Sequence, residues 1–162
     1  MEKITIHHTV KKESEGTYYT VGFDVPAGVE KVTVSYRYNR LPAVQAMPGK
    51  NKRFMNVIDL GLEDGNGRFL GWSGGARTTV SVGEFDATNG YLTTPIVPGT
   101  WRILVGAYKV EPGGVDVDYE ITFTEKKPRW FFGDLHMHSN ASDGQYRIAG
   151  RKTRGDTQIG RA

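Results

Sequence analysis

The chain has 162 residues, of which 21 are Lys or Arg and 18 are Asp or Glu, so its formal net charge is +3. A chain of this length is expected to form a domain with a core large enough to fold without disulfides. It contains no cysteine, which excludes disulfide frameworks, thiolate metal sites and cysteine nucleophiles. No stretch approaches the roughly 20 apolar residues of a membrane span, and the N-terminus lacks the apolar run of a signal peptide. We therefore predict a cytoplasmic protein with no membrane contact.

The positive charge is concentrated near the C-terminal end. Residues 145–162 carry five basic side chains and one acidic one, which leaves 16 basic and 17 acidic side chains for residues 1–144. Nucleic-acid-binding domains usually show a basic patch on the folded body, and here the body is nearly neutral. We therefore predict no nucleic-acid partner.

Nine segments alternate apolar and polar residues with the period of a β-strand. They are rich in Val, Ile, Thr and Tyr, which suits strands with one buried face. No segment before residue 140 has a convincing helical period. The predicted strands are 4–10, 18–25, 31–37, 56–62, 68–71, 78–82, 101–110, 115–124 and 130–136.

Turn residues separate these segments. Pro98-Gly99 and Pro112-Gly-Gly114 preset a bend or tolerate positive φ, and Asp64-Gly65 with Asn66-Gly67 predicts a hairpin between its flanking strands. The segment 41–53 is predicted to be a surface loop. Many short strands joined by Gly and Pro turns are typical of an antiparallel β-sandwich. We predict an all-β, jelly-roll-like sandwich.

The segment Gly71-Trp-Ser-Gly-Gly-Ala-Arg77 allows two interpretations. One is a ligand loop in which Trp72 is a stacking platform and Arg77 binds an anion. The other, which the sequence favours, is a tight turn whose glycines permit close backbone approach. A sugar-stacking surface made of Trp72, Tyr91, Trp101 and Trp130 is an alternative, but Trp101 shares one strand face with Ile103 and Val105 and is expected in the core.

Two further groups of polar residues favour structural roles. Asp59, Glu63, Asp64 and Asn66 offer oxygen ligands for Ca²⁺, but their spacing is not that of a calcium loop, and a solvated hairpin is the preferred interpretation. His7 and His8 are adjacent, so they point to opposite faces of a strand and cannot chelate together. We expect one of them to be exposed and the other packed.

The stretch Gly133-Asp-Leu-His-Met-His-Ser-Asn-Ala-Ser-Asp-Gly144 carries the most specific pattern. His136 and His138 are two residues apart and share one face of a strand, and Asp143 follows after a turn that can bring it back to that face. Two imidazoles and a carboxylate suit Zn²⁺, Mn²⁺ or Fe²⁺, and open coordination positions allow water activation. The spacing alone favours two exposed histidines on an edge strand, because such pairs are common.

The complete string resembles the first metal motif of the PHP-domain (polymerase and histidinol phosphatase) metallohydrolases. More narrowly, residues 5 to about 144 resemble the N-terminal part of CehA/McbA-like members, in which a β-rich domain precedes the His-x-His motif. The supporting stretches are 56–62, 71–77, 98–110 and 129–136. The resemblance implies a distorted β/α barrel that holds two or three metal ions and activates a hydroxide against a phosphoester or another hydrolysable bond of a small-molecule ester.

By this resemblance, His136 and His138 would be metal ligands on the first barrel strand, and Asp143 a further ligand or an orienting carboxylate. The family's second motif, bridging Glu, further His ligands and late Asp-x-His do not occur in the sequence. Because one strand cannot form a barrel, we predict no hydrolase activity for this chain alone.

The predicted organisation has three parts. Residues 1–128 form an accessory β-sandwich domain, 129–144 begin a truncated PHP metallohydrolase domain, and 145–162 form a disordered tail, which is native, frameshifted or vector-derived. Residues 129–136 would be an orphaned interface that packs against the missing barrel or self-associates. The alternative is a stand-alone β-sandwich binding module for a glycan or protein partner, marked by a line of exposed aromatic side chains away from 129–136.

Overall fold

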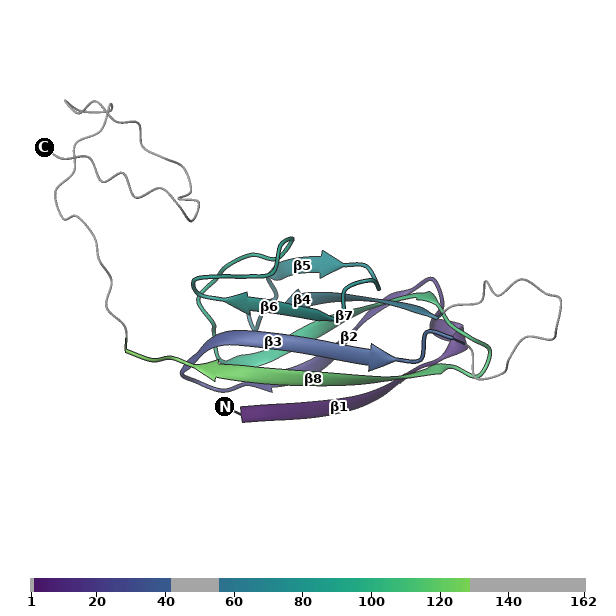
Figure 1. The fold of residues 1–162 in the computed structure, drawn as a ribbon, viewed down its shortest axis with the longest axis horizontal. Coiled ribbons are helices and arrows are strands. Elements are labelled where there is room, and N and C mark those ends of the chain that lie inside the picture. Colours follow the sequence, from purple (N-terminus) through teal and green to yellow (C-terminus); the bar gives the residue numbers. More distant parts are fainter. Residues whose placement is uncertain (1, 42–55, 129–162) are drawn as a thin grey trace, which may run out of the picture. The chain divides into compact units, whose positions relative to one another are not determined.

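Eight β-strands and one 3₁₀ turn make up the part of the chain that the computed structural model describes, residues 2–41 and 56–128 (Figure 1). The chain divides after Lys127 into two units, and the described domain is the first of them. Its elements are β1 (Glu2–Val10), the 3₁₀ turn (Lys12–Ser14), β2 (Tyr18–Val25), β3 (Val29–Tyr38), β4 (Val57–Glu63), β5 (Phe69–Ser73), β6 (Thr79–Gly83), β7 (Gly99–Lys109) and β8 (Val115–Glu125).

The strands form two four-stranded antiparallel sheets, in the orders β1-β8-β3-β6 and β2-β7-β4-β5. The predicted all-β class is therefore confirmed, and so are the eight predicted strands between residues 4 and 124. The ninth, at 130–136, and the tail from 145 lie outside the described residues, as does all of the loop predicted at 41–53 except its first residue. The described ranges contain no helix that is long and apolar enough to cross a membrane.

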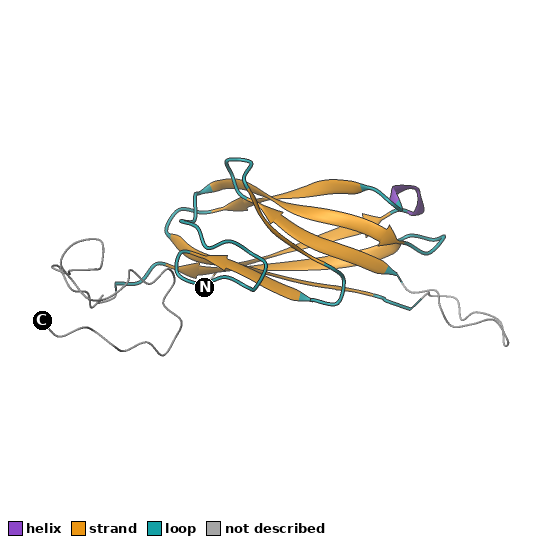
Figure 2. Cartoon of the chain, turned by 90° about the horizontal axis from the view of Figure 1, so that it is seen from above, coloured by secondary structure: helices purple, strands orange, loops and turns teal. Residues whose placement is uncertain are grey.

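Alternating apolar side chains from both sheets fill one shared core between them. Trp101, Ile103 and Val105 of β7 are fully buried, as the sequence predicts. Tyr119 and Ile121 of β8, in the other sheet, are buried in the same core. More buried and less buried residues alternate along strands such as β2 and β8, and the side chains that point away from the core form the outer faces of the domain. Loops and the 3₁₀ turn lie at the ends of the strands (Figure 2).

The hairpin predicted around Asp64 joins β4 to β5, and Gly67 adopts a φ of 78° in its turn. The predicted solvation is wrong for Asp64, which is 2% exposed. Its Oδ1 accepts hydrogen bonds from the backbone N–H groups of Asn66 and Arg68, both at 2.9 Å. The carboxylate is buried because it satisfies the backbone donors of the turn.

Candidate functional site

The predicted metal ligands His136, His138 and Asp143 lie outside the described residues. Within residues 2–41 and 56–128, no group of three or more His, Asp or Glu side chains is arranged to hold a metal ion. The divalent metal therefore stays a prediction from the motif. The candidate site that the structure does describe lies on the two-sheet domain itself.

Large apolar side chains gather on the outer face of the β2-β7-β4-β5 sheet. We call this surface the aromatic face, and it comprises Tyr18 of β2, Leu104 and Tyr108 of β7, and Phe69 and Trp72 of β5. Tyr18 is 74% exposed, Tyr108 68% and Phe69 54%. Single exposed apolar residues are ordinary, but a contiguous group on one face is typical of a binding surface.

Trp72 lies over two glycines of neighbouring strands. A Cβ added to Gly61 of β4 would come within 2.5 Å of Cε3 of Trp72, and one added to Gly106 of β7 within 2.8 Å of its Cζ2 and Cη2. Contacts under about 3 Å do not occur for real Cβ atoms, so a side chain at either position would displace the indole. These two glycines form a seat on which the ring of Trp72 rests against the sheet.

The indole reaches across the sheet toward the opposite edge. Trp72 pairs with Gly61 in the β4–β5 register, and Gly106 pairs with Tyr18 in the β2–β7 register. The rings of Tyr18 and Trp72 meet edge to face, with centroids 5.5 Å apart and planes at 63°. This geometry is favourable for aromatic pairs. Trp72 is thus held by the backbone beneath it and by Tyr18 at its side.

Two open hollows flank Trp72. The first, of about 350 Å³, is almost entirely apolar, and the second, of about 610 Å³, is more polar. The first is lined by Tyr18, Tyr19, Thr20, Phe69, Trp72 and Leu104. The second is lined by Val57, Asp59, Tyr108, Asn89 and residues 72–77. Both volumes are in the range of ligand sites.

The second hollow brings Trp72 and Arg77 together. Arg77 donates from Nη1 to the backbone oxygen of Asn89, and Oδ1 of Asp59 accepts from the backbone N–H of Gly75 at 2.8 Å. The tight-turn interpretation is confirmed for residues 74–77, where the N–H of Arg77 donates to the oxygen of Gly74 at 3.2 Å and a Cβ on Gly75 would lie 3.1 Å from the oxygen of Ile58. It is wrong for residues 71–73, which belong to β5. This tight turn also places Arg77 in the same hollow as Trp72, so ligand binding by these two residues stays a prediction.

The structure does not place the other residues of the predicted sugar-stacking surface on the aromatic face. Trp101 is fully buried, and Tyr91 is 7% exposed with its hydroxyl donating to the oxygen of Leu60 at 2.8 Å. Trp130 lies outside the described residues. The four-residue stacking surface is therefore wrong for Tyr91 and Trp101. The sequence pattern did not reveal the exposed rings of the aromatic face, Tyr18, Phe69 and Tyr108.

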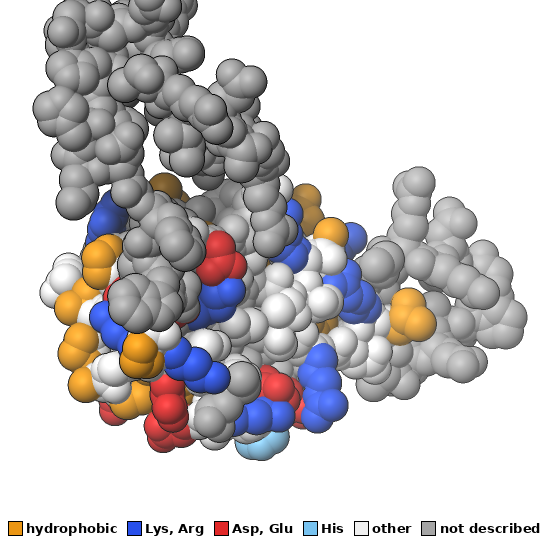
Figure 3. Space-filling model, turned by 60° about the vertical axis from the view of Figure 1, so that its left-hand side comes forward, with side chains coloured by type: hydrophobic (Ala, Val, Ile, Leu, Met, Phe, Trp, Pro, Cys, Tyr) orange, Lys and Arg blue, Asp and Glu red, His pale blue; other side chains and the backbone are white. Residues whose placement is uncertain are grey.

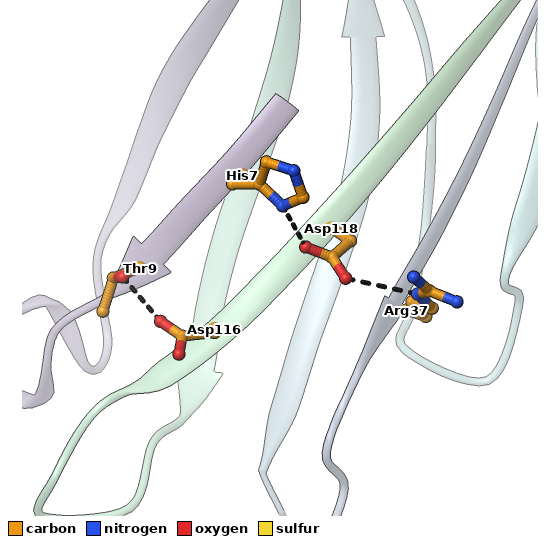
Figure 4. Close-up of polar contacts among 5 residues, drawn as sticks. All are labelled: His7, Thr9, Arg37, Asp116 and Asp118. Carbon is orange, nitrogen blue, oxygen red and sulfur yellow. Dashed lines mark hydrogen bonds and ion pairs between the residues drawn. The ribbon is translucent and has the colours of Figure 1, made fainter. Parts of the chain in front are cut away.

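The outer face of the β1-β8-β3-β6 sheet is polar. Asp118 of β8 accepts from Nδ1 of His7 at 2.5 Å and from Nε of Arg37 at 3.2 Å, while Thr9 donates to Asp116 at 2.6 Å (Figure 4). These five residues define what we call the polar face. The hydrogen bond from His7, and to a smaller extent the one from Arg37, holds the pKa of the Asp118 carboxyl below its usual range.

The two adjacent histidines differ as the sequence predicts. His7 is exposed on the polar face, while His8 is half-buried and shares a 2.8 Å hydrogen bond with the hydroxyl of Tyr19. Burial lowers the pKa of His8.

On the part of the surface seen in Figure 3, acidic and basic side chains lie beside one another.

None of the protein-family models matches this chain, and a search of curated proteins finds no match.

Proposed function

We propose that the two-sheet domain is the accessory β-sandwich of a PHP-type metal-dependent hydrolase. The observation that carries the proposal is the string Asp-Leu-His-Met-His-Ser-Asn-Ala-Ser-Asp-Gly, which begins at Asp134, shortly after β8 ends at Glu125. The strand pairs β1–β8, β2–β7, β3–β6 and β4–β5 support the jelly-roll-like form of the sandwich.

In this proposal, His136, His138 and Asp143 hold a divalent metal ion, Zn²⁺, Mn²⁺ or Fe²⁺. Such a donor set suits these ions, and the bound metal supplies an activated water for phosphoester hydrolysis. Residues 129–136 would pair with a barrel or with a second copy of the chain. Because the 162 residues contain one of the family's metal motifs, this chain by itself is expected to bind metal weakly and to be inactive. The proposal includes a cytoplasmic location.

Calorimetric titration of the full chain with Mn²⁺ and Zn²⁺ tests this proposal. We expect weak binding that His136→Ala and His138→Ala abolish, and that the matched variant His7→Ala leaves unchanged. If metal binding is absent, or if it survives His136→Ala, the assignment of His136, His138 and Asp143 as metal ligands is overturned. Hydrolysis of p-nitrophenyl phosphate with Mn²⁺ well above the His136→Ala background would contradict the expected inactivity.

A second candidate is a stand-alone binding module for a glycan or protein partner. The observation that favours it is the aromatic face, where Tyr18, Phe69 and Tyr108 are all more than half exposed. Both candidates use the same sandwich. They differ in whether residues 134–144 contribute, so His136→Ala separates them: it impairs metal binding in the first and leaves partner binding unchanged in the second.

A further inference from the structure

We infer that the aromatic face binds neutral sugar units of an oligo- or polysaccharide, with Trp72 as the stacking platform and Asp59 and Arg77 as hydrogen-bonding partners. The inference deepens the second candidate function and does not depend on the metal motif.

The indole of Trp72 is held in a fixed position. One side of the Trp72 ring rests on Gly61 and Gly106, and the edge contact with Tyr18 restrains it laterally. Trp72 nevertheless remains partly exposed. A ring that is already held in place loses little conformational freedom when it binds. The C–H groups on one side of a pyranose ring form a flat apolar surface that packs well on such an aromatic plane.

The polar hollow beside Trp72 carries two opposite charges. Among the described residues that line it, one is a carboxylate, Asp59, and one a guanidinium, Arg77. A carboxylate accepts at two oxygens and a guanidinium has five N–H donors, so their bonds to Gly75 and Asn89 leave capacity for a ligand. Sugar hydroxyls donate to the first group and accept from the second. Because the two charges are opposite, the hollow is complementary to a neutral polyhydroxyl ligand.

The shape of the aromatic face suits an extended ligand. Hollows of about 350 and 610 Å³ lie on either side of Trp72, and both are open to solvent. This arrangement provides room for consecutive units of a chain, with one ring on the indole and its neighbours in the hollows. A single small ligand is more commonly held in an enclosed cavity that buries most of its surface.

A proline-rich peptide is the main rival occupant, since aromatic grooves also bind extended proline-rich segments. Such a peptide has few N–H groups because proline lacks one. The Asp59 carboxylate would keep its bond from the N–H of Gly75, but its remaining acceptor capacity would be covered without a new hydrogen bond, which is costly. The polar hollow therefore favours a sugar, whose hydroxyl groups can donate to that carboxylate.

The test is calorimetry of the full chain with cellohexaose, xylohexaose, laminarihexaose and maltohexaose. Trigalacturonate serves as an anionic comparison and an Ala-Pro decapeptide as the peptide rival. Trp72→Ala removes the platform. Gly106→Ala keeps Trp72 but fills its seat, since the new Cβ would lie 2.8 Å from the indole. Phe85→Ala is the matched control, because Phe85 is a 52% exposed ring that lines neither hollow.

We expect at least one neutral hexasaccharide to bind, with affinity reduced at least about tenfold by Trp72→Ala and by Gly106→Ala. Phe85→Ala and His136→Ala should leave it unchanged. If Trp72→Ala does not fold, as judged by circular dichroism, Tyr18→Ala takes its place and should also weaken binding. The inference is overturned if none of the neutral hexasaccharides binds, or if trigalacturonate or the peptide binds more tightly. It is also overturned if folded Trp72→Ala binds like the unmodified chain, or if both Gly106→Ala and Tyr18→Ala do. Loss of metal binding with sugar binding intact would reject the hydrolase proposal alone.

Discussion

The two outer faces of the domain are built from the same alternation of strand residues, yet their side chains make different kinds of contact. On the polar face, charged and hydroxyl groups bond to one another across the strands, as His7 and Arg37 do with Asp118. On the aromatic face, glycines at positions 61 and 106 make room for Trp72, and rings such as Tyr18 and Tyr108 are left largely exposed.

This difference separates a solvated surface from a candidate binding surface. The groups of the polar face already have partners, and exposed ion pairs of this kind contribute little to stability. The exposed rings of the aromatic face contribute little to the stability of the fold, because most of their surface stays in contact with water. Their apolar surface becomes useful when a ligand covers it. We therefore expect substitutions beneath Trp72 to change stability most, and substitutions on the polar face to change it least.

The largest effect is expected from filling the seat of Trp72. In Gly61→Ala, the new Cβ would lie 2.5 Å from Trp72 and 2.9 Å from the backbone oxygen of Gly71. Because the backbone cannot easily move away, we expect a loss of about 2–3 kcal/mol in the free energy of unfolding. The matched control is Gly22→Ala in β2 of the same sheet, where the nearest atom would be 3.4 Å away. If urea denaturation gives equal stabilities for the two variants, the indole of Trp72 does not pack on Gly61 as described.

A smaller effect is expected from removing the platform. Trp72 is partly exposed, so Trp72→Ala should lose part of the burial energy of a large side chain, about 1–2 kcal/mol. Tyr108→Ala, which truncates a ring that is 68% exposed, should change stability by less than about 0.5 kcal/mol. Thermal and urea unfolding measure both. A larger loss for Tyr108→Ala than for Trp72→Ala would reverse our view of which ring packs on the sheet.

The smallest effect belongs to the polar face and depends on pH. His7 and Arg37 lower the pKa of Asp118 in the folded state, so the unfolded chain takes up a proton there at higher pH than the folded chain does. The stabilisation is therefore present above about pH 4, the ordinary range of an Asp carboxyl, and is lost as the pH falls through the lowered pKa.

Asp118→Asn should accordingly reduce the pH dependence of the free energy of unfolding on the acid side. The reduction should be slight, because the group is exposed. Urea unfolding at several pH values between about 2 and 6 measures this slope. Asp24→Asn, on the outer side of the other sheet, is the control. An unchanged slope in Asp118→Asn would show that the contacts with His7 and Arg37 do not act in solution.

Much of the fold follows from local pattern. The period of two along 101–105 places Trp101, Ile103 and Val105 in the core, and the Asp-Gly and Asn-Gly pairs after residue 63 mark the hairpin. Both signals operate within one strand or one turn, so no knowledge of the sheet order is needed. The same reasoning predicts that one of the two adjacent histidines is exposed and the other packed, and the structure exposes His7 and half-buries His8.

The stretch 71–77 offers Trp72 and Arg77 as ligand residues, although the sequence favours a turn there. The rest of the candidate site could not be predicted in this way, because it depends on which strands are neighbours. Gly61 and Gly106 are 45 positions apart in the sequence, and they meet beneath Trp72 because β4 and β7 pair between β5 and β2. Tyr91 follows an Asn-Gly turn and therefore resembles a surface residue. The structure buries it because its hydroxyl reaches Leu60 and Gly71 has no side chain to exclude its ring.

The most direct test of the binding role assigned to the aromatic face is an NMR titration of the full, ¹⁵N-labelled chain with the four neutral hexasaccharides. We expect the shifts to concentrate at the indole N–H of Trp72 and at the amides around Gly61, Arg77 and Gly106, with His7 and Asp118 unaffected. Shifts confined to the polar face or to residues 134–144, or no shifts with any of the four sugars, would contradict the account.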